Sequence, residues 1–199
     1  MSLDLTAAEP RRRNAAGTRA AILASARKAF ARSGYDGAGV REIAAGAGVT
    51  AMLVNRYFGS KEKLFAEVCA DTMREPVILS AENLAAPDFA AAFAQALVRV
   101  TAPGATPLDG FLILLQSASS PRAAEIGREW IRRGHQSTLE GAIEGPLSRE
   151  RAAVALALVA GMQVMRQMME IEGLADAAPA DLEAVLTPMM RALFERALP

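Results

Sequence analysis

The chain has 199 residues and a mass of 21.0 kDa, and 52% of its residues are hydrophobic, enough for one compact unit or two small ones. Its single cysteine, Cys69, and single histidine, His135, exclude an intramolecular disulfide and a metal site of clustered histidines and cysteines. No stretch of about 18 apolar residues predicts a membrane span, and residues 1–17 lack the apolar core of a signal peptide. We therefore expect a cytoplasmic protein without membrane contact.

The net charge of zero conceals an asymmetry along the chain. Residues 1–65 carry 11 lysines and arginines against 5 aspartates and glutamates, a net charge of +6, and residues 66–199 carry −6. A basic head on an acidic body is typical of a protein that touches a polyanion with one end, although solvated charges can also cluster by chance.

The segment 1–16 shows no hydrophobic periodicity and contains the run Arg11-Arg12-Arg13. It is predicted to be a flexible basic arm. Such an arm either adds electrostatic attraction to a polyanion or, where that polyanion is a nucleic-acid duplex, enters its minor groove, and the sequence favours neither alternative.

The stretch 40–65 predicts two short helices around a tight turn and the start of a third. Apolar residues three and four apart give the first helix one apolar face. Gly48 ends that helix where a left-handed residue is needed. Thr50 is suited to cap the second helix and Ser60 the third. This pattern is a helix-turn-helix, whose second helix can enter the major groove of DNA.

These residues resemble the N-terminal signature of the tetracycline-repressor-like (TetR) family over roughly residues 15–70. The matching motifs are Ile43-Ala44, Ala47-Gly48-Val49-Thr50, Tyr57-Phe58, Ser60-Lys61-Glu62 and Leu64-Phe65, preceded by a helix over 18–33 and by Gly34-Tyr35. Two positions depart from the family pattern. Asn55 stands where the family usually has an aromatic residue, and Gly39 stands where it usually has a hydroxyl-bearing residue.

The predicted recognition helix, residues 51–58, has an anchoring face and an outward face. Val54 and Phe58 lie four apart and are the expected anchors. Arg56 can bond guanine in bidentate fashion, and Asn55 can bond adenine in the same way or contact phosphate instead. The apolar residues at its start can pack on thymine methyl groups. With the phosphate contacts that the resemblance implies, the expected DNA-binding residues are Thr18, Arg19, Arg41, Thr50, Ala51, Met52, Leu53, Asn55, Arg56, Tyr57 and Lys61.

Beyond residue 65 the hydrophobic spacing predicts helices only. The expected fold is all-α with about nine helices: a helix-turn-helix DNA-binding domain over 17–65 and a helical effector-binding and dimerisation domain over 66–199. The third helix is expected to reach about residue 79 with a kink or early end near Pro76. The later helices are expected over 89–100, 108–119, 121–144, about 148–172 after a Ser148 cap, and from 179 onward with a bend at Pro188. The helix over 108–119 is apolar on most faces, which predicts burial at the centre of the C-terminal body.

The last two predicted helices are expected to form a homodimer by packing as a four-helix bundle. Small residues allow close approach, and large apolar ones near the C-terminus supply area, although the same faces can instead be intrachain core. The residues concerned are Ala152, Ala153, Ala155, Ala157, Ala160, Gly161, Met189, Leu193 and Phe194. A two-fold dimer would present two recognition helices to the half-sites of a palindromic operator in double-stranded DNA.

The resemblance also implies a small-molecule effector, which we expect to be mostly apolar and uncharged or weakly polar. The candidate lining residues are Phe93, Phe111, Leu114, Leu115, Ser117, Trp130, His135, Met162, Gln163, Met165 and Met169. Methionine suits a site that reshapes around an apolar guest, but such stripes also form ordinary cores.

No catalytic constellation is found, because the single histidine and cysteine are far apart and the serines form no nucleophile motif. We expect no enzyme activity, no metal and no cofactor. The predicted function is that of a sequence-specific DNA-binding transcriptional regulator, a repressor by the resemblance, released by its effector. The alternative is a dimeric DNA-binding protein whose C-terminal half only dimerises or binds a protein partner.

Overall fold

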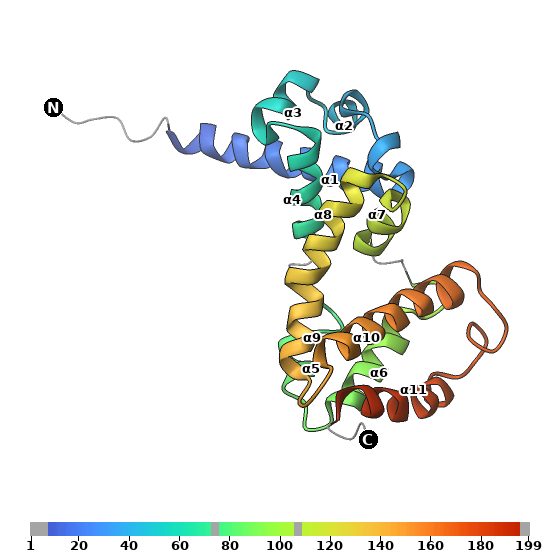
Figure 1. Cartoon of the computed structure of the whole chain (residues 1–199). Helices are drawn as coiled ribbons and strands as arrows, with labels where there is room; N and C mark the ends of the chain where they lie inside the picture. Colours follow the sequence, from blue (N-terminus) through green and yellow to red (C-terminus); the bar gives the residue numbers. More distant parts are fainter. Residues whose placement is uncertain (1–7, 73–75, 106–108, 196–199) are drawn as a thin grey trace. The chain divides into compact units, whose positions relative to one another are not determined.

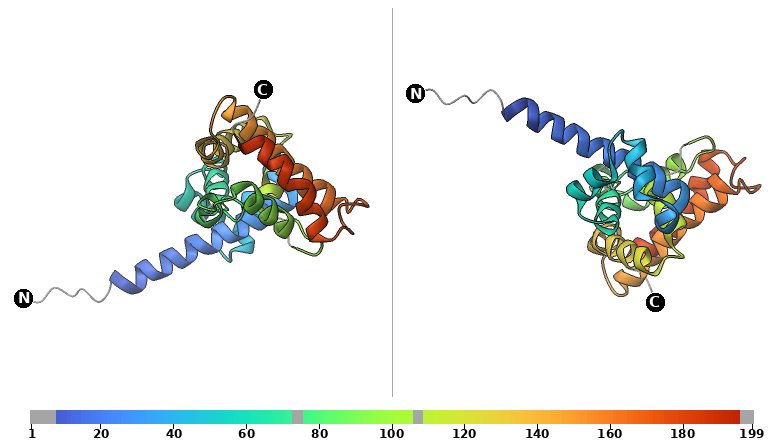
Figure 2. Two further views of the ribbon diagram at one scale, coloured as in Figure 1. Left: turned by 90° about the horizontal axis from the view of Figure 1, so that it is seen from below. Right: turned by 90° about the horizontal axis from the view of Figure 1, so that it is seen from above.

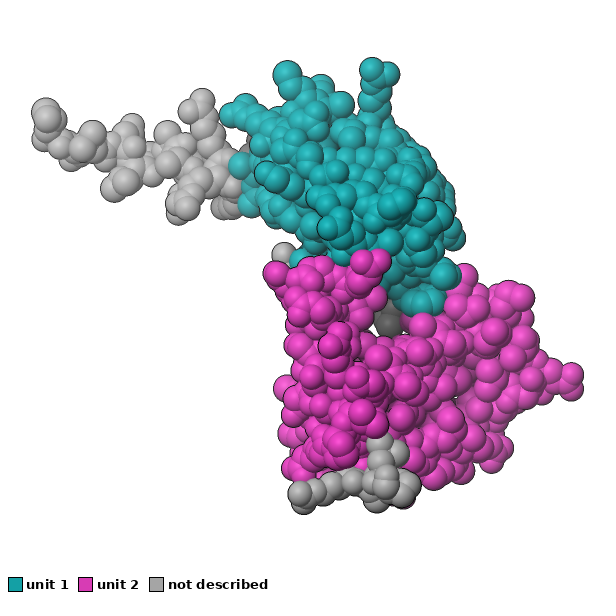
Figure 3. All heavy atoms as spheres, in the orientation of Figure 1, with its two compact units in different colours: residues 1–72, 109–127 teal, residues 73–108, 128–199 magenta. Residues whose placement is uncertain are grey.

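The computed structural model describes residues 8–72, 76–105 and 109–195, with side chains from residue 15 onward (Figure 1). The described residues form helices α1–α11 with two π-helical turns and contain no strand, which confirms the all-α prediction. No helix among them is long and apolar enough to cross a membrane. The chain divides into two compact units, residues 1–72 with 109–127 and residues 73–108 with 128–199 (Figure 3).

The first unit contains the predicted helix-turn-helix. Its helices are α1 (Ala8–Gly37), α2 (Val40–Gly46), α3 (Ala51–Phe58), α4 (Lys61–Asp71), α7 (Asp109–Ser117) and the start of α8 (Pro121–Ile131). Three aromatic rings centre its core. The Phe65 ring meets the rings of Phe30 and Tyr35 edge-on, with centroids 5.1 Å apart in each pair. Cys69 lies four residues after Phe65 on α4 and is buried. Burial raises the pKa of its thiol to about 12, so the role of Cys69 is packing.

The start of α1 differs from the expected arm. The helix begins at Ala8, so the second half of the segment 1–16 is helical, and residues 1–7 lie outside the described residues. Alanine and arginine are strong helix formers, and Pro10 stands in the first turn, where proline is tolerated.

The end of α1 agrees with the predicted helix over 18–33. Gly34 has φ 65° and ψ −176° and interrupts the helical backbone there. A Cβ atom at Gly34 would lie 2.2 Å from the carbonyl oxygen of Gln116 in α7. The absence of a side chain at Gly34 is therefore what allows α1 and α7 to approach so closely.

The expected position of the apolar helix over 108–119 is wrong. This helix is α7, and it packs along α1 in the first unit instead of at the centre of the C-terminal body. Polar contacts explain this choice of partner. The Ser117 hydroxyl accepts from the Tyr35 amide at 2.9 Å, and the Arg27 guanidinium binds Asp109 at 2.7 Å.

The second unit is a helical body around one apolar core. Its elements are α5 (Ala81–Leu84), α6 (Phe89–Val100), the end of α8, the π-helical turn η1 (Arg132–Gln136), α9 (Ser137–Ala142), α10 (Ser148–Met162), the π-helical turn η2 (Gln163–Met168) and α11 (Pro179–Phe194). Helix α11 packs against both α6 and α10, and the core includes Phe93, Leu97, Leu186 and Met190 (Figure 2). As predicted, α6 begins after Asp88, whose carboxylate accepts from the Ala91 amide at 2.9 Å.

Three predicted boundaries shift. Helix α4 ends at Asp71, with Thr72 as its C-cap, before it reaches Pro76. Ser148 is the first residue of α10 and not its cap; Leu147, with φ 58°, holds the cap position without a side-chain hydrogen bond. The helix expected to about residue 172 turns π-helical at Gln163 and ends at Met168.

Candidate nucleic-acid interface and effector site

Helices α3 and α4 begin at the cap residues that the sequence predicts. The Thr50 hydroxyl accepts from the Leu53 amide at 3.3 Å at the start of α3, and the Ser60 hydroxyl accepts from the Lys63 amide at 3.2 Å at the start of α4. Gly48 has φ 67° in the turn. These local interactions give the helix-turn-helix its geometry before any long-range contact is considered.

The two faces of α3 are as predicted. Val54 and Phe58 are 2% and 4% exposed and anchor the helix, whereas Met52 is 79% exposed. Asn55 and Arg56 are also exposed. Within the part of the chain that the structure describes, no hydrogen bond or ion pair holds the Arg56 guanidinium. An exposed methionine beside free polar groups is the composition of a surface that reads base edges and thymine methyl groups.

The other expected DNA-binding residues differ in their exposure. Lys61 and Arg19 already have intramolecular partners: Lys61 lies 4.7 Å from the Tyr35 ring centroid and donates to the Asp36 carbonyl at 3.5 Å. Arg19 lies 4.9 Å from the Phe58 ring centroid and pairs with Glu67. Arg41 is exposed, and Thr18, Ala51, Leu53 and Tyr57 are half-buried. Their contacts with DNA stay predictions.

The structure separates the predicted effector residues. Phe111, Leu114, Leu115 and Ser117 stand on α7 in the first unit, and the other seven stand in the second unit. Among those seven, Phe93, Met162 and Gln163 are buried, whereas Met165 and Met169 are 46% and 65% exposed.

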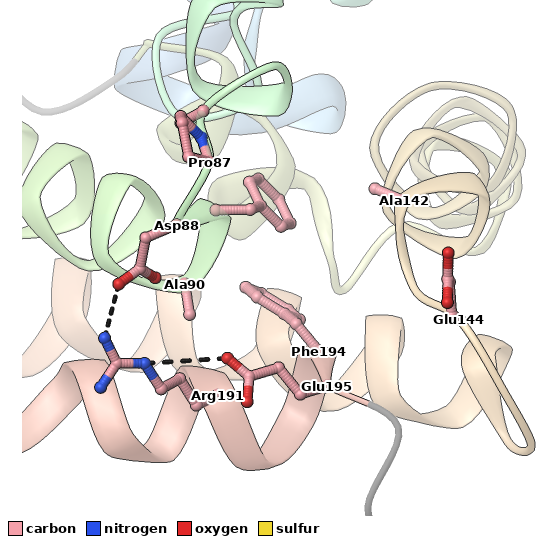
Figure 4. Close-up of a pocket in the computed structure, with 10 residues that line it drawn as sticks. Pro87, Asp88, Ala90, Ala142, Glu144, Arg191, Phe194 and Glu195 are labelled. Atoms are coloured by element: carbon pink, nitrogen blue, oxygen red, sulfur yellow. Dashed lines mark hydrogen bonds and ion pairs between the residues drawn. The ribbon is translucent and has the colours of Figure 1, made fainter.

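A pocket of about 680 Å³ that the sequence did not predict lies in the second unit (Figure 4). It is formed by the chain entering α6, the end of α9 and the end of α11. The Phe89 and Phe194 rings stack on one side with centroids 4.8 Å apart. Arg191 joins Asp88 to Glu195 across it. The hydrogen bond from the Ala91 amide, followed by that from Arg191, lowers the pKa of Asp88. Three distant segments build this pocket, and no sequence period connects them.

His135 lies against the edge of Trp130, with ring centroids 5.4 Å apart, and burial lowers the pKa of His135 below its ordinary value. The unfolded chain therefore binds this proton more readily, and the free energy of unfolding should fall as the pH drops below about 6.5. His135→Gln removes this titration. In urea unfolding at pH 7.5 and pH 5.5, we expect a smaller loss of stability for the variant than for the wild type. Equal losses would show that His135 is solvated.

Helix caps, a buried anchor face and an outward-facing α3 define a helix-turn-helix DNA-binding protein. Two family models match the sequence: "Bacterial regulatory proteins, tetR family" over residues 22–68 and "Tetracyclin repressor-like, C-terminal domain" over residues 87–194. The chain therefore belongs to the TetR family and is a DNA-binding transcriptional regulator. No curated protein matches the sequence.

Several solved structures share the fold. A transcriptional regulator from Rhodococcus sp. Rha1 is 25% identical, with 91% of this chain and 99% of that chain covered and a TM-score of 0.62. NalD of Pseudomonas aeruginosa, the secondary repressor of the MexAB-OprM multidrug efflux pump, is 21% identical, with coverages of 92% and 98% and a TM-score of 0.62. AibR, crystallised with isovaleryl coenzyme A and operator DNA, is 17% identical, with coverages of 90% and 100% and a TM-score of 0.61.

Proposed function

We propose that this regulator is a homodimeric repressor that binds a palindromic operator through α3 and leaves it when a small effector binds the second unit. The observation that carries the DNA-binding part is the outward face of α3, where Met52, Asn55 and Arg56 are exposed on a helix anchored by two buried side chains. The net charge of +6 over residues 1–65 supports attraction to DNA at the same end.

Repression and the binding of a small molecule are supported by two structurally similar proteins. NalD is a repressor, and AibR binds isovaleryl coenzyme A and operator DNA in one crystal. In this chain, the second unit offers the buried residues Phe93, Met162 and Gln163 as candidate effector contacts. An effector that prefers one conformation of the second unit would shift the population away from the DNA-binding form.

The dimer is proposed through α10 and α11, with a contact set that keeps Met189 but differs in part from the residues first expected. Ala152, Ala155 and Phe194 belong to the intrachain core, and Leu193 packs against it. The exposed apolar residues include Val154 (54%) on α10, Val185 (60%) and Met189 (46%) on α11, and Met165 (46%) on the turn η2 that follows α10. A face of this kind, apolar and left uncovered by its own chain, suits isologous contact with a second copy.

The central experiment is selection of the operator from fragmented genomic or random DNA, followed by binding of the selected site to Arg56→Ala. We expect the variant to lose roughly 1–3 kcal/mol of operator affinity, about 5- to 150-fold, because a bidentate contact to guanine is removed. Lys28→Ala, an exposed lysine on α1, removes the same charge away from α3 and is the matched control. Failure to select any palindromic sequence would contradict the proposal, and an equal loss on random DNA would assign Arg56 to phosphate.

Met52 should read a thymine methyl group. Replacing thymines of the selected operator by uracil, one at a time, removes only that methyl, and we expect one position per half-site at which wild-type affinity falls about 3- to 10-fold. In Met52→Ala, the same replacement should cost nothing further, because the partner of the methyl is already absent. Fluorescence anisotropy at fixed salt measures this cycle. Independent losses for the two changes would show that Met52 points elsewhere.

A further inference from the structure

A group of long polar side chains is buried on the π-helical turn η2. Gln163 and Arg166 are each 1% exposed, and Gln167 is half-buried one residue further on. The three stand within one turn in the second unit. The turn η2 continues α10 directly and ends at Met168, and no helix follows it among the described residues before α11.

The Arg166 guanidinium is held only by neutral groups. Its Nε donates to the Leu174 carbonyl at 2.9 Å, and its Nη1 donates to the Val98 carbonyl at 2.6 Å and to the Thr101 hydroxyl at 3.2 Å. No carboxylate pairs with it within the described ranges of the chain. The Val98 carbonyl near the end of α6 and the Leu174 carbonyl offset part of its charge, but a buried cation without an anion is costly. Burial lowers the pKa of Arg166.

A purely structural role does not explain the two glutamines. The hydrogen bonds of Arg166 already connect the end of α6 to Leu174, so this connection does not require the glutamines. The buried Gln163 Nε2 has no hydrogen-bond partner among the described residues. Gln167 Oε1, an acceptor, also has no partner among these residues, although its Nε2 donates to the Ala105 carbonyl at 2.9 Å. A buried donor without an acceptor destabilises the folded state, so the unused donor of Gln163, on the same turn as the unpaired Arg166, points to a missing acceptor.

We propose that Gln163 and Arg166 form the polar end of the effector site and that the effector is a monocarboxylate. The inference rests on the proposed effector response and names its chemistry. A carboxylate has two oxygens that accept from neighbouring donors, and its single negative charge matches the single buried cation. A phosphate dianion would leave one charge uncompensated in the core. The apolar part of the ligand lies among the core side chains next to Gln163, of which Met162 is the most adaptable. The effector is therefore anionic, in contrast to the uncharged molecule expected from the sequence.

The test uses straight-chain monocarboxylates from acetate to decanoate on the full-length protein bound to fluorescent operator DNA. Their primary amides, equal in length and neutral, are the controls. Anisotropy measures release, and thermal unfolding of the same samples measures binding to the free protein. We expect a window of chain lengths that releases DNA and raises Tm, with the amides weaker by about 10- to 100-fold, the worth of a hydrogen bond to a charged group.

Two variants test whether Gln163 and Arg166 bind the carboxylate. Gln163→Met removes the unpaired amide at similar volume, so the free variant should keep or raise the wild-type Tm while carboxylate release needs about tenfold more ligand. Arg166→Lys keeps the charge and loses the planar guanidinium, and should weaken release by a similar factor if it folds.

The possible outcomes distinguish the chemical class of the effector, the location of its site and the proposed function. Equal action of acids and amides overturns the anionic class and leaves effector control standing. Release that is unchanged in Gln163→Met, or a marked fall in its Tm without ligand, overturns the assignment of this site. The absence of any response across the series overturns the monocarboxylate. Failure of the unliganded wild type to bind its operator would instead refute the proposed function.

Discussion

Replacing Gly34 with alanine is expected to destabilise the DNA-binding unit by about 3 kcal/mol or more. Gly34 combines φ 65° with ψ −176°, a region of backbone space open essentially to glycine alone. The new Cβ would lie 2.2 Å from the Gln116 carbonyl oxygen and 2.8 Å from its carbon. Both are backbone atoms of α7, which cannot turn aside as a flexible side chain can, so α1 and α7 must separate.

Gly48→Ala is the matched control for this clash. Gly48 also has a positive φ, 67°, but a Cβ there would meet nothing within 4 Å. Its substitution should therefore cost only the conformational term, about 1 kcal/mol. Urea unfolding followed by circular dichroism gives both free energies of unfolding, and operator binding at 25 °C shows whether Gly34→Ala retains function. Similar costs for the two variants would contradict the close approach of α7 to Gly34.

The helix-turn-helix could be predicted residue by residue because its signals are local. A glycine in the turn and hydroxyls at Thr50 and Ser60 act within three residues of their own positions, and the structure contains each of these features. Val54 and Phe58 were predictable as anchors because a spacing of four places two side chains on one helix face. Such features need no knowledge of the rest of the fold.

The partner of α7 could not be predicted in this way. Hydrophobic spacing predicts which side of a helix is buried. Because α7 is apolar on most sides, its spacing predicts neither which side faces the core nor which helix it packs against. The contacts that decide its position join residues more than 80 apart, such as Ser117 to Tyr35 and Asp109 to Arg27. Several expected effector residues therefore turned out to stand in the DNA-binding unit.

The buried polar turn η2 was missed for a related reason. Gln163 is among the predicted effector-lining residues, but Arg166 is not, because an arginine in a helix is ordinarily solvated, whereas Arg166 is buried. Its burial depends on carbonyl groups at Val98 and Leu174, which carry no sequence signal. The π-helical geometry likewise leaves no trace in a spacing of three and four.

The second large effect is expected at the proposed dimer face. Val185→Glu should convert the protein to a monomer, because the valine is 60% exposed in the single chain and a carboxylate buried there between two copies would lack a partner. Met189 lies four residues further on the same side of α11 and is also exposed, so the charge would fall inside the proposed contact.

When Val185→Glu makes the protein monomeric, operator affinity should also fall at least about 100-fold, because the two linked recognition helices of a dimer gain an effective concentration that a monomer lacks. Ala184→Glu adds the same charge one residue earlier, about 100° around the helix, and is the control for charge alone. Sedimentation should show a 21.0 kDa species for Val185→Glu and a species twice as heavy for the wild type and for Ala184→Glu. Circular dichroism should show equal helix content in all three, since Val185 stands outside the core cluster. If Val185→Glu remained dimeric with full operator affinity, the interface between the two copies would have to lie on another face of the second unit.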